Sequence, residues 1–123
     1  MIKVHKGIYV KKSNTHGWGV FTNLEIKKGT IVEECIIPYE VIPINSRVLL
    51  NYRYVWPSKK KPTSFCIALG FGSIYNHSKE KPSMNWEINE KERIMTFTAI
   101  RNINANEELL FDYDSPLQTE YDN

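Results

Sequence analysis

The sequence predicts a mostly β domain built from short strands. Segments rich in β-branched or aromatic residues alternate with turn-forming residues, a pattern typical of small sheets. Only the stretch 45–54 is a candidate for a helix, because Asn45 or Ser46 could cap a short turn there. The chain has 123 residues, enough for one compact domain with its own core. We therefore expect a single domain over residues 1–123.

The predicted strands are joined by short connections. In chain order they cover residues 7–13, 19–21, 30–37, 64–71, 85–88, 93–100 and 108–113. The segment NEKE at 89–92 predicts a hairpin loop between Trp86 and Ile94.

Two turns have similar sequences. LEIKKGTIVEE at 24–34 and RNINANEELL at 101–110 each place an isoleucine before turn residues and a strand. Asn106 falls where Gly29 falls, and asparagine tolerates a left-handed backbone better than most residues. The sequence thus predicts two similar β-units.

Composition is that of an ordinary globular protein. The hydrophobic fraction is 41% and the charged fraction 24%. No apolar run approaches the ~20 residues that span a bilayer, and the first residues lack the apolar stretch of a secretory signal, so we expect an intracellular protein. Cys35 and Cys66 lie in apolar segments, where burial is the expected role.

Charge is unevenly distributed along the chain. Residues 1–62 hold 11 Lys/Arg against 4 Asp/Glu, and residues 63–123 hold 5 against 10. The net charge of +2 does not indicate nucleic-acid binding. The acidic half could attract a basic partner, unless the fold interleaves both halves. PSKKKP at 57–62 predicts an exposed loop, with contact to a phosphate or an acidic partner as the alternative.

The histidines and cysteines do not have the spacing of a metal site or of a hydrolase active site. His5, His16 and His77 have no metal-ligand spacing. A Cys66–His77 pair lacks an orienting group, and the apolar strand around Cys66 would keep its thiol inert. GFG at 70–72 and the G-x-G in HGWGV have no helix pattern of a nucleotide site after them.

ELLFDYD at 108–114 is an aromatic strand that ends in acid. Alternation turns Leu109, Phe111 and Tyr113 toward one face and Asp112 toward the other. A buried Tyr113 phenol needs a hydrogen-bond partner. The strand therefore predicts a polar group in apolar surroundings.

Taken in order, five segments resemble the SET domain, a family of protein-lysine methyltransferases. They are GWGVF, LEIKKGTIVEE, NYRYVW, LGFGSIYNHS and ANEELLFDY. The resemblance runs from about Ile8 to Tyr113, leaves a tail at 114–123, and is greatest to the minimal stand-alone SET proteins of viruses and bacteria. It implies small curved β-sheets, few short helices, and a C-terminal strand that passes through a loop beside Asn-His-Ser as a pseudoknot.

The resemblance also implies a cofactor site for S-adenosylmethionine. Gly17, Trp18 and Gly19 match the turn that contacts the cofactor through its backbone, and Asn76 and His77 match residues at its methionine and adenine portions. Tyr121 is a candidate to close the pocket in place of a zinc-held lid, and a second subunit of a homodimer is the alternative.

On the substrate side, the resemblance implies a narrow lysine channel. Tyr52 matches a tyrosine of the active-site pocket, and Tyr113 matches the one beside the transferred methyl group. Phe111 holds the position that tunes product multiplicity, and phenylalanine there favours multiple methylation. Methyl transfer to an amine needs positioning of the reactants rather than a catalytic triad. It also needs a neutral lysine, and lysine arrives charged because its solution pKa is ~10.4.

The expected substrate is a basic protein such as a histone tail. Acidic residues near the C-terminus would attract it, namely Glu107, Glu108, Asp112, Asp114, Glu120 and Asp122. If the source were viral or pathogenic, the host nucleus would be the expected compartment. The alternatives are a SET fold that only binds a partner, and nucleic-acid binding through lysines 59–61. Two departures from the family pattern are Asn106 in place of glycine and a loop at 79–86 that is one residue longer, with Ser83 after Pro82.

Overall fold

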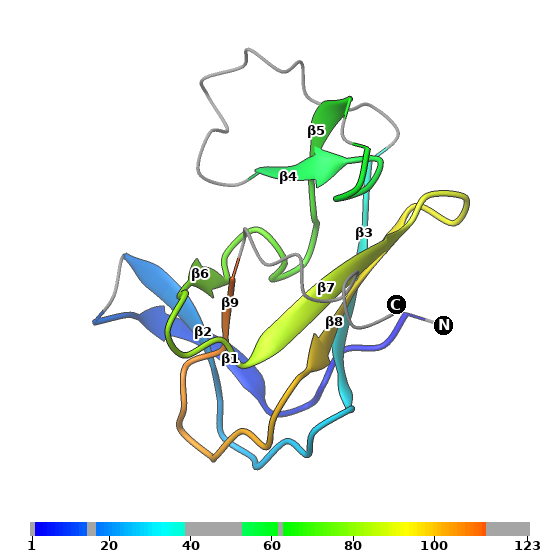
Figure 1. Ribbon diagram of the computed structural model, residues 1–123. Coiled ribbons are helices and arrows are strands. Elements are labelled where there is room, and N and C mark those ends of the chain that lie inside the picture. Colours follow the sequence, from blue (N-terminus) through cyan, green and yellow to red (C-terminus); the bar gives the residue numbers. More distant parts are fainter. Residues whose placement is uncertain (1, 15–16, 39–52, 62, 113–123) are drawn as a thin grey trace.

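The computed structural model describes residues 2–14, 17–38, 53–61 and 63–112 (Figure 1). Within these ranges the chain forms strands and no helix, so none that could span a membrane. The strands are β1 (Ile8–Lys12), β2 (Trp18–Thr22), β3 (Ile31–Ile36), β4 (Arg53–Trp56), β5 (Ser64–Ile67), β6 (Asn76–His77), β7 (Met84–Asn89), β8 (Ile94–Ala99) and β9 (Leu110–Phe111). The predicted mostly β fold of small sheets is confirmed.

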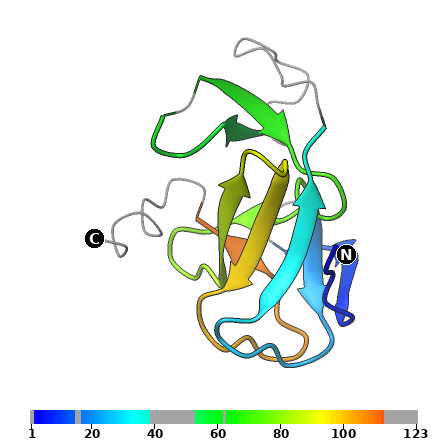
Figure 2. The ribbon, with the colours of Figure 1, turned by 90° about the vertical axis from the view of Figure 1, so that its right-hand side faces the viewer.

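Three sheets make up the described part of the chain. β1 pairs with β2, β4 pairs with β5, and the five-stranded sheet has the order β3-β8-β7-β9-β6. The β4–β5 hairpin lies at the opposite end of the molecule from the β2–β3 and β8–β9 connections (Figures 1 and 2). Because β3 lies in one sheet with strands of the acidic half, the fold interleaves the two halves of the chain.

The predicted β7–β8 hairpin is present. Asn89 pairs with Ile94, and the Asn89 Oδ1 accepts a hydrogen bond from the Glu92 backbone N–H at 2.9 Å. Along β8, Met95, Phe97 and Ala99 alternate into the core, so one face of the sheet is apolar.

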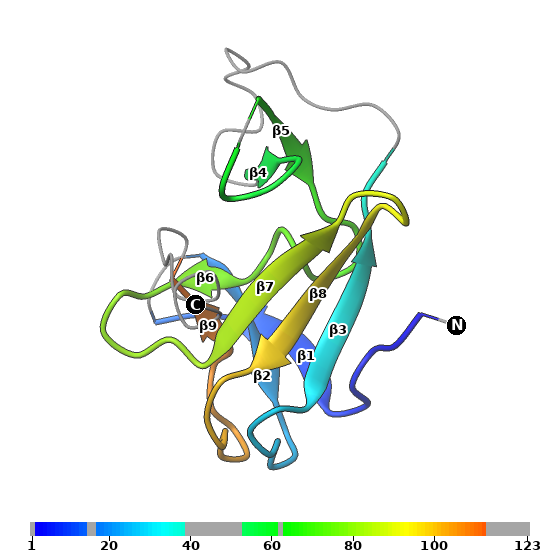
Figure 3. The ribbon, with the colours of Figure 1, turned by 45° about the vertical axis from the view of Figure 1, so that its right-hand side comes forward.

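The C-terminal strand β9 lies between two strands that are neighbours in sequence (Figure 3). It pairs in parallel with β6, through Asn76↔Leu110 and His77↔Phe111, and with β7, through Met84↔Phe111. Residues 78–83 connect β6 to β7 across this inserted strand. The expected placement of the last strand beside Asn-His-Ser is thus observed.

The two similar turns are also observed. Ile26 and Ile103 exchange backbone hydrogen bonds of 2.9 and 2.8 Å. Gly29 has φ 89° and Asn106 has φ 72°, so both adopt the predicted left-handed backbone.

Some expected boundaries were wrong. Arg53 and Tyr54, the end of the helix candidate, begin strand β4, and residues 45–52 lie outside the described ranges. The segment 64–71 leaves the strand after Ile67, and the short strand β6 was not predicted. In the predicted exposed loop 57–61, Lys60 and Lys61 are exposed, but Lys59 is partly buried.

The core fills the space between the sheets. Its largest fully buried side chains include Trp86, Phe97, Met84 and Met95. The two cysteines are buried free thiols, as predicted.

Candidate active site

The turn between β1 and β2 brings the predicted Gly17-Trp18-Gly19 segment to the surface. Gly17 has φ 48°, and its carbonyl oxygen accepts a hydrogen bond from the Ser13 N–H at 2.7 Å. A Cβ on Gly17 would meet no atom within 4 Å, and the Trp18 side chain is 57% exposed. This turn therefore presents open space and an aromatic face to solvent.

Glu108 ties this turn to the strands behind it. Its Oε1 accepts from the Ser13 hydroxyl at 2.8 Å, and its Oε2 accepts from the Asn76 amide at 2.8 Å. The same amide donates to the Trp18 carbonyl oxygen at 3.2 Å. A Cβ on Gly19 would lie 2.3 Å from Glu108 Oε2, so only glycine permits this approach.

Asn76 makes structural contacts besides the cofactor role that the resemblance implies, which stays a prediction. Its side-chain nitrogen holds Trp18 and Glu108 together, so it supports the walls of the site. Glu108 was not singled out from the sequence as a site residue. Alternation along the strand puts Glu108 on the other face from the buried Leu109 and Phe111, and this pattern could have indicated its position.

His77 is on the surface beside β9. Its Nδ1 lies 3.9 Å from the Asp112 Oδ1, and its ring meets the Phe111 ring edge-on at 6.2 Å between centroids. Cys66, which the sequence analysis considered with His77 as a hydrolase pair, lies in β5 opposite Tyr54. Burial raises the pKa of Cys66 to about 12, so the thiol is a poor nucleophile at neutral pH.

Behind β9 lies an aromatic cluster of Tyr54, Trp86, Phe97 and Phe111. Phe111 is 5% exposed, and its ring centroid lies 5.4 Å from that of Tyr54. Trp86 packs edge-on against Tyr54 at 5.0 Å, and the Tyr54 hydroxyl donates to the Gly72 carbonyl oxygen at 2.6 Å. The sequence analysis named Tyr52 in this segment, which lies outside the described residues, and did not name Tyr54. Alternation puts Tyr54 and Trp56 on one buried face.

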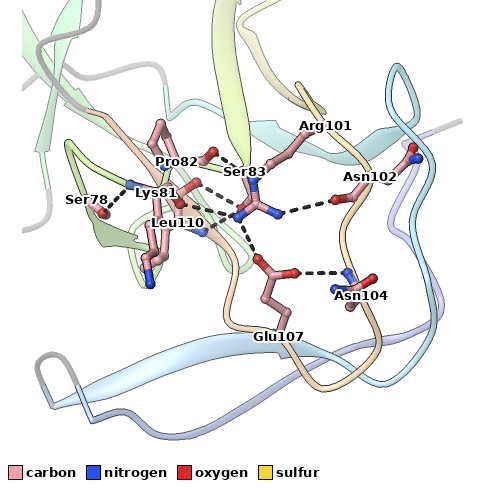
Figure 4. Close-up of polar contacts among 9 residues, drawn as sticks. All are labelled: Ser78, Lys81, Pro82, Ser83, Arg101, Asn102, Asn104, Glu107 and Leu110. Atoms are coloured by element: carbon pink, nitrogen blue, oxygen red, sulfur yellow. Dashed lines mark hydrogen bonds and ion pairs between the residues drawn. The ribbon is translucent and has the colours of Figure 1, made fainter.

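The loop that departs from the family pattern is firmly held (Figure 4). The Ser83 hydroxyl donates to the Leu110 carbonyl oxygen at 3.2 Å, and the Leu110 N–H donates back to it at 3.0 Å. Arg101 donates to the carbonyl oxygens of Pro82 at 3.2 Å and Lys81 at 3.4 Å. Serine at position 83 thus satisfies both polar groups of a residue in β9.

Arg101 also pairs with Glu107 at 2.5 Å (Figure 4). Partial burial alone would raise the pKa of Glu107. The hydrogen bonds from Arg101 and the Asn104 N–H outweigh it, and the pKa is lowered. Glu107 and Glu108 were expected to attract a basic substrate. Their carboxylates instead pair with groups of the same chain, namely Arg101, Ser13 and Asn76.

The predicted site residues divide into three groups. Gly17, Trp18, Gly19, Asn76 and His77 lie together around β2 and β6, and Phe111 belongs to the adjoining aromatic cluster. Tyr52, Tyr113 and Tyr121 lie outside the described residues. Among the described residues, no group of three or more His, Cys, Asp or Glu could hold a metal ion.

Known proteins resemble this chain in sequence and in fold. The family model of the SET domain matches residues 17–114. A histone-lysine N-methyltransferase of Schizosaccharomyces pombe, H3 lysine-37 specific, is 34% identical over 70 residues, which cover 57% of this chain and 44% of that protein. The match thus spans less than half the length of the curated relative.

Solved structures extend the likeness over nearly the whole chain. A candidate histone methyltransferase of Plasmodium falciparum is 31% identical, with a TM-score of 0.67 over 94% of this chain and 99% of that one. CpSET8 of Cryptosporidium is 26% identical, with a TM-score of 0.66 over 88% and 57%. The polycomb repressive complex 2 of Chaetomium thermophilum shares the fold, with a TM-score of 0.68 at 22% identity over 92% and 16%.

Proposed function

The chain belongs to the SET domain family, and we propose that it is a protein-lysine N-methyltransferase that uses S-adenosylmethionine. One observation carries the proposal. Insertion of β9 between β6 and β7 puts the surface turn at Gly17 and Trp18, with His77, next to an aromatic cluster that contains Phe111. A cofactor surface and an apolar lysine channel need this adjacency.

The residues on the surface side fit such a cofactor. Trp18 offers an exposed aromatic face, Gly17 leaves open space above the backbone, and His77 exposes its imidazole. Backbone groups of this turn and these two rings would hold the cofactor, while Asn76 and Glu108 keep the turn in place. When bound, S-adenosylmethionine supplies a methyl group on a positively charged sulfur.

The aromatic side would prepare the acceptor lysine. Rings of Tyr54, Trp86 and Phe111 supply an environment with few polar partners, which disfavours an ammonium and favours the neutral amine. The same rings would hold the aliphatic stem and align its nitrogen. Tyr113, two residues after Phe111, is the residue we propose to orient the amine through its hydroxyl.

The proposed substrate is a lysine in a basic protein such as a histone. The relatives' names support this class. With Glu107 and Glu108 engaged internally, attraction would depend on other acidic groups, of which Asp112 is next to the site. A homodimer that closes the cofactor pocket stays a prediction.

The test measures labelled methyl transfer from S-adenosylmethionine to histone H3, with the modified residue identified by tandem mass spectrometry. We expect methyl-lysine, and a loss of about 100-fold or more for Tyr113→Phe if its hydroxyl orients the reaction. Tyr9→Phe is the matched control, because Tyr9 stacks on Phe21 in the β1–β2 sheet. Thermal melting of each variant checks that the fold is retained.

Different failures have different meanings. Undiminished transfer by Tyr113→Phe would contradict the role given to that hydroxyl. Calorimetry that detects no binding of S-adenosylmethionine would reject the proposed cofactor. Binding without transfer to any lysine would favour a SET fold that only binds a partner.

A further inference from the structure

Lys59, in the loop between β4 and β5, is unlike its neighbours. Lys60 and Lys61 are exposed, whereas Lys59 turns inward and places its Nζ 4.1 Å from the centroid of the Trp86 ring. The nitrogen itself is buried and has no hydrogen-bond partner among the described residues. The ring face attracts an ammonium, but it accepts none of the three hydrogen bonds that a lysine ammonium can donate, so burial still disfavours the charged form.

The ring beneath Lys59 belongs to the proposed lysine channel. Trp86 is 1% exposed and packs against Tyr54, whose ring contacts Phe111. Asp112, which follows Phe111 and precedes Tyr113, lies close enough to act on Lys59 electrostatically. Lys59 therefore points toward the side of the molecule where an acceptor lysine would lie.

The charge state of Lys59 fits that of an acceptor. Burial lowers the pKa of Lys59 to about 7, although Glu87 and Asp112 both favour the charged form. A large share of the amine is then neutral near pH 7, which leaves a lone pair on the nitrogen. Exposed Lys60 and Lys61 have no comparable surroundings.

We propose that Lys59 is a methyl acceptor within its own chain, a site of intramolecular self-methylation; this rests on the proposed function. The Lys59 ammonium first gives one proton to water and becomes the neutral amine. The carbon–sulfur bond of the sulfonium then breaks with its electron pair left on sulfur, as the Nζ lone pair bonds to the methyl carbon. The products are a thioether and a positively charged methylated amine, so atoms and charge balance.

The experiment incubates the full chain with labelled S-adenosylmethionine, alone and with histone H3, and maps methylated residues by tandem mass spectrometry. We expect label on Lys59, loss of nearly all self-labelling in Lys59→Arg, and normal labelling in Lys60→Arg and Lys61→Arg. The rate per molecule should not change on dilution of the protein, because donor and acceptor belong to one chain.

A second measurement needs no cofactor. In an NMR titration of lysine side-chain carbons, we expect Lys59 to titrate near pH 7, and a midpoint at the ordinary lysine value of 10.5 would overturn the proposal. Label on H3 but not on Lys59 overturns it while the proposed function stands. Label on neither rejects both, and label on Lys60 or Lys61 instead, or a rate that falls on dilution, also overturns it.

Discussion

Glu33 and Lys59 each bury an ionisable group, but the surroundings of the two groups differ. Glu33, on β3, is 2% exposed; its carboxylate accepts from the Tyr75 hydroxyl at 2.7 Å and from the Phe71 N–H at 2.9 Å. Lys59 has an aromatic ring beneath its nitrogen and, among the described residues, no acceptor. The carboxylate connects β3 to two points of the β5–β6 connection, whereas among the described residues the amine makes no hydrogen bond.

This difference separates a charge with a structural role from one that we propose to be reactive. A buried group with matched partners stabilises one arrangement of the chain, and its loss leaves those partners unsatisfied. A buried group without them raises the energy of the fold and persists where chemistry uses it. The two groups should therefore respond to substitution with opposite signs.

The largest expected effect is that of Glu33→Ala. It removes the acceptor of the buried Tyr75 hydroxyl and of the partly buried Phe71 N–H, and it leaves a cavity. We therefore expect a loss of about 3–4 kcal/mol in the free energy of unfolding. Urea denaturation measures it. Glu34→Ala is the control. Glu34 is on the same strand, and in the described part of the chain its side chain accepts an exposed N–H from Lys3 and no other, so the variant should cost about 1 kcal/mol or less. Equal losses would mean that the Glu33 contacts do not stabilise the fold.

Gly70→Ala would disturb the same carboxylate, because the added Cβ would clash with it. The new Cβ would lie 2.3 Å from Glu33 Oε2 and also require φ 79°, so we expect a loss of about 2–3 kcal/mol. Gly29→Ala is matched for strain, since Gly29 has φ 89° but open space around its Cβ. The difference between the two variants in urea unfolding isolates the contact with Glu33, and no difference would contradict it.

The sequence predicted the fold better than it predicted these two groups. The turns at Gly29 and Asn106 and the hairpin loop at 89–92 are present as predicted. They could be predicted because they depend on the conformational preferences of a few adjacent residues. Burial of Glu33 depends on a bulge, because the register between β3 and β8 shifts between Ile31 and Glu33, which turns two successive residues inward. Simple alternation could not predict that.

The site was predicted in outline and missed in its supports. The resemblance to the SET domain implied that Gly17, Trp18, Asn76 and His77 serve one cofactor site, and in the structure the Asn76 side chain donates to the Trp18 carbonyl oxygen. Glu108 was missed because its partners Ser13 and Asn76 are 95 and 32 residues away in sequence. Lys59 was missed because three adjacent lysines between prolines predict a solvated loop, and only tertiary packing selects one of them.

Tyr75→Phe removes one donor to Glu33 and keeps the ring. Burial and the neighbouring Glu33 raise the pKa of Tyr75, so the phenol stays protonated and donates throughout the neutral range. We expect a loss of about 1.5–2 kcal/mol in urea unfolding, less than for Glu33→Ala because the Phe71 N–H still pairs. Tyr9→Phe, with a ring stacked on Phe21 away from Glu33, should cost less; a loss as large would assign the effect to phenol removal in general.

Lys59→Met should act in the opposite direction and depend on pH. The folded pKa of about 7 lies below the unfolded 10.5, so between these values the unfolded chain binds more protons. Stability of the unmutated protein therefore rises with pH across that window, and its ammonium penalty is fully present below pH 7. Methionine keeps contact with Trp86 without a charge, so we expect the variant to be more stable at pH 7 by on the order of 1 kcal/mol, after discounting for water that reaches a partly exposed side chain. Urea unfolding at several pH values should show this advantage shrinking toward pH 10.5, whereas Lys60→Met should show none. An advantage independent of pH would indicate better packing by methionine and would remove the contrast with Glu33.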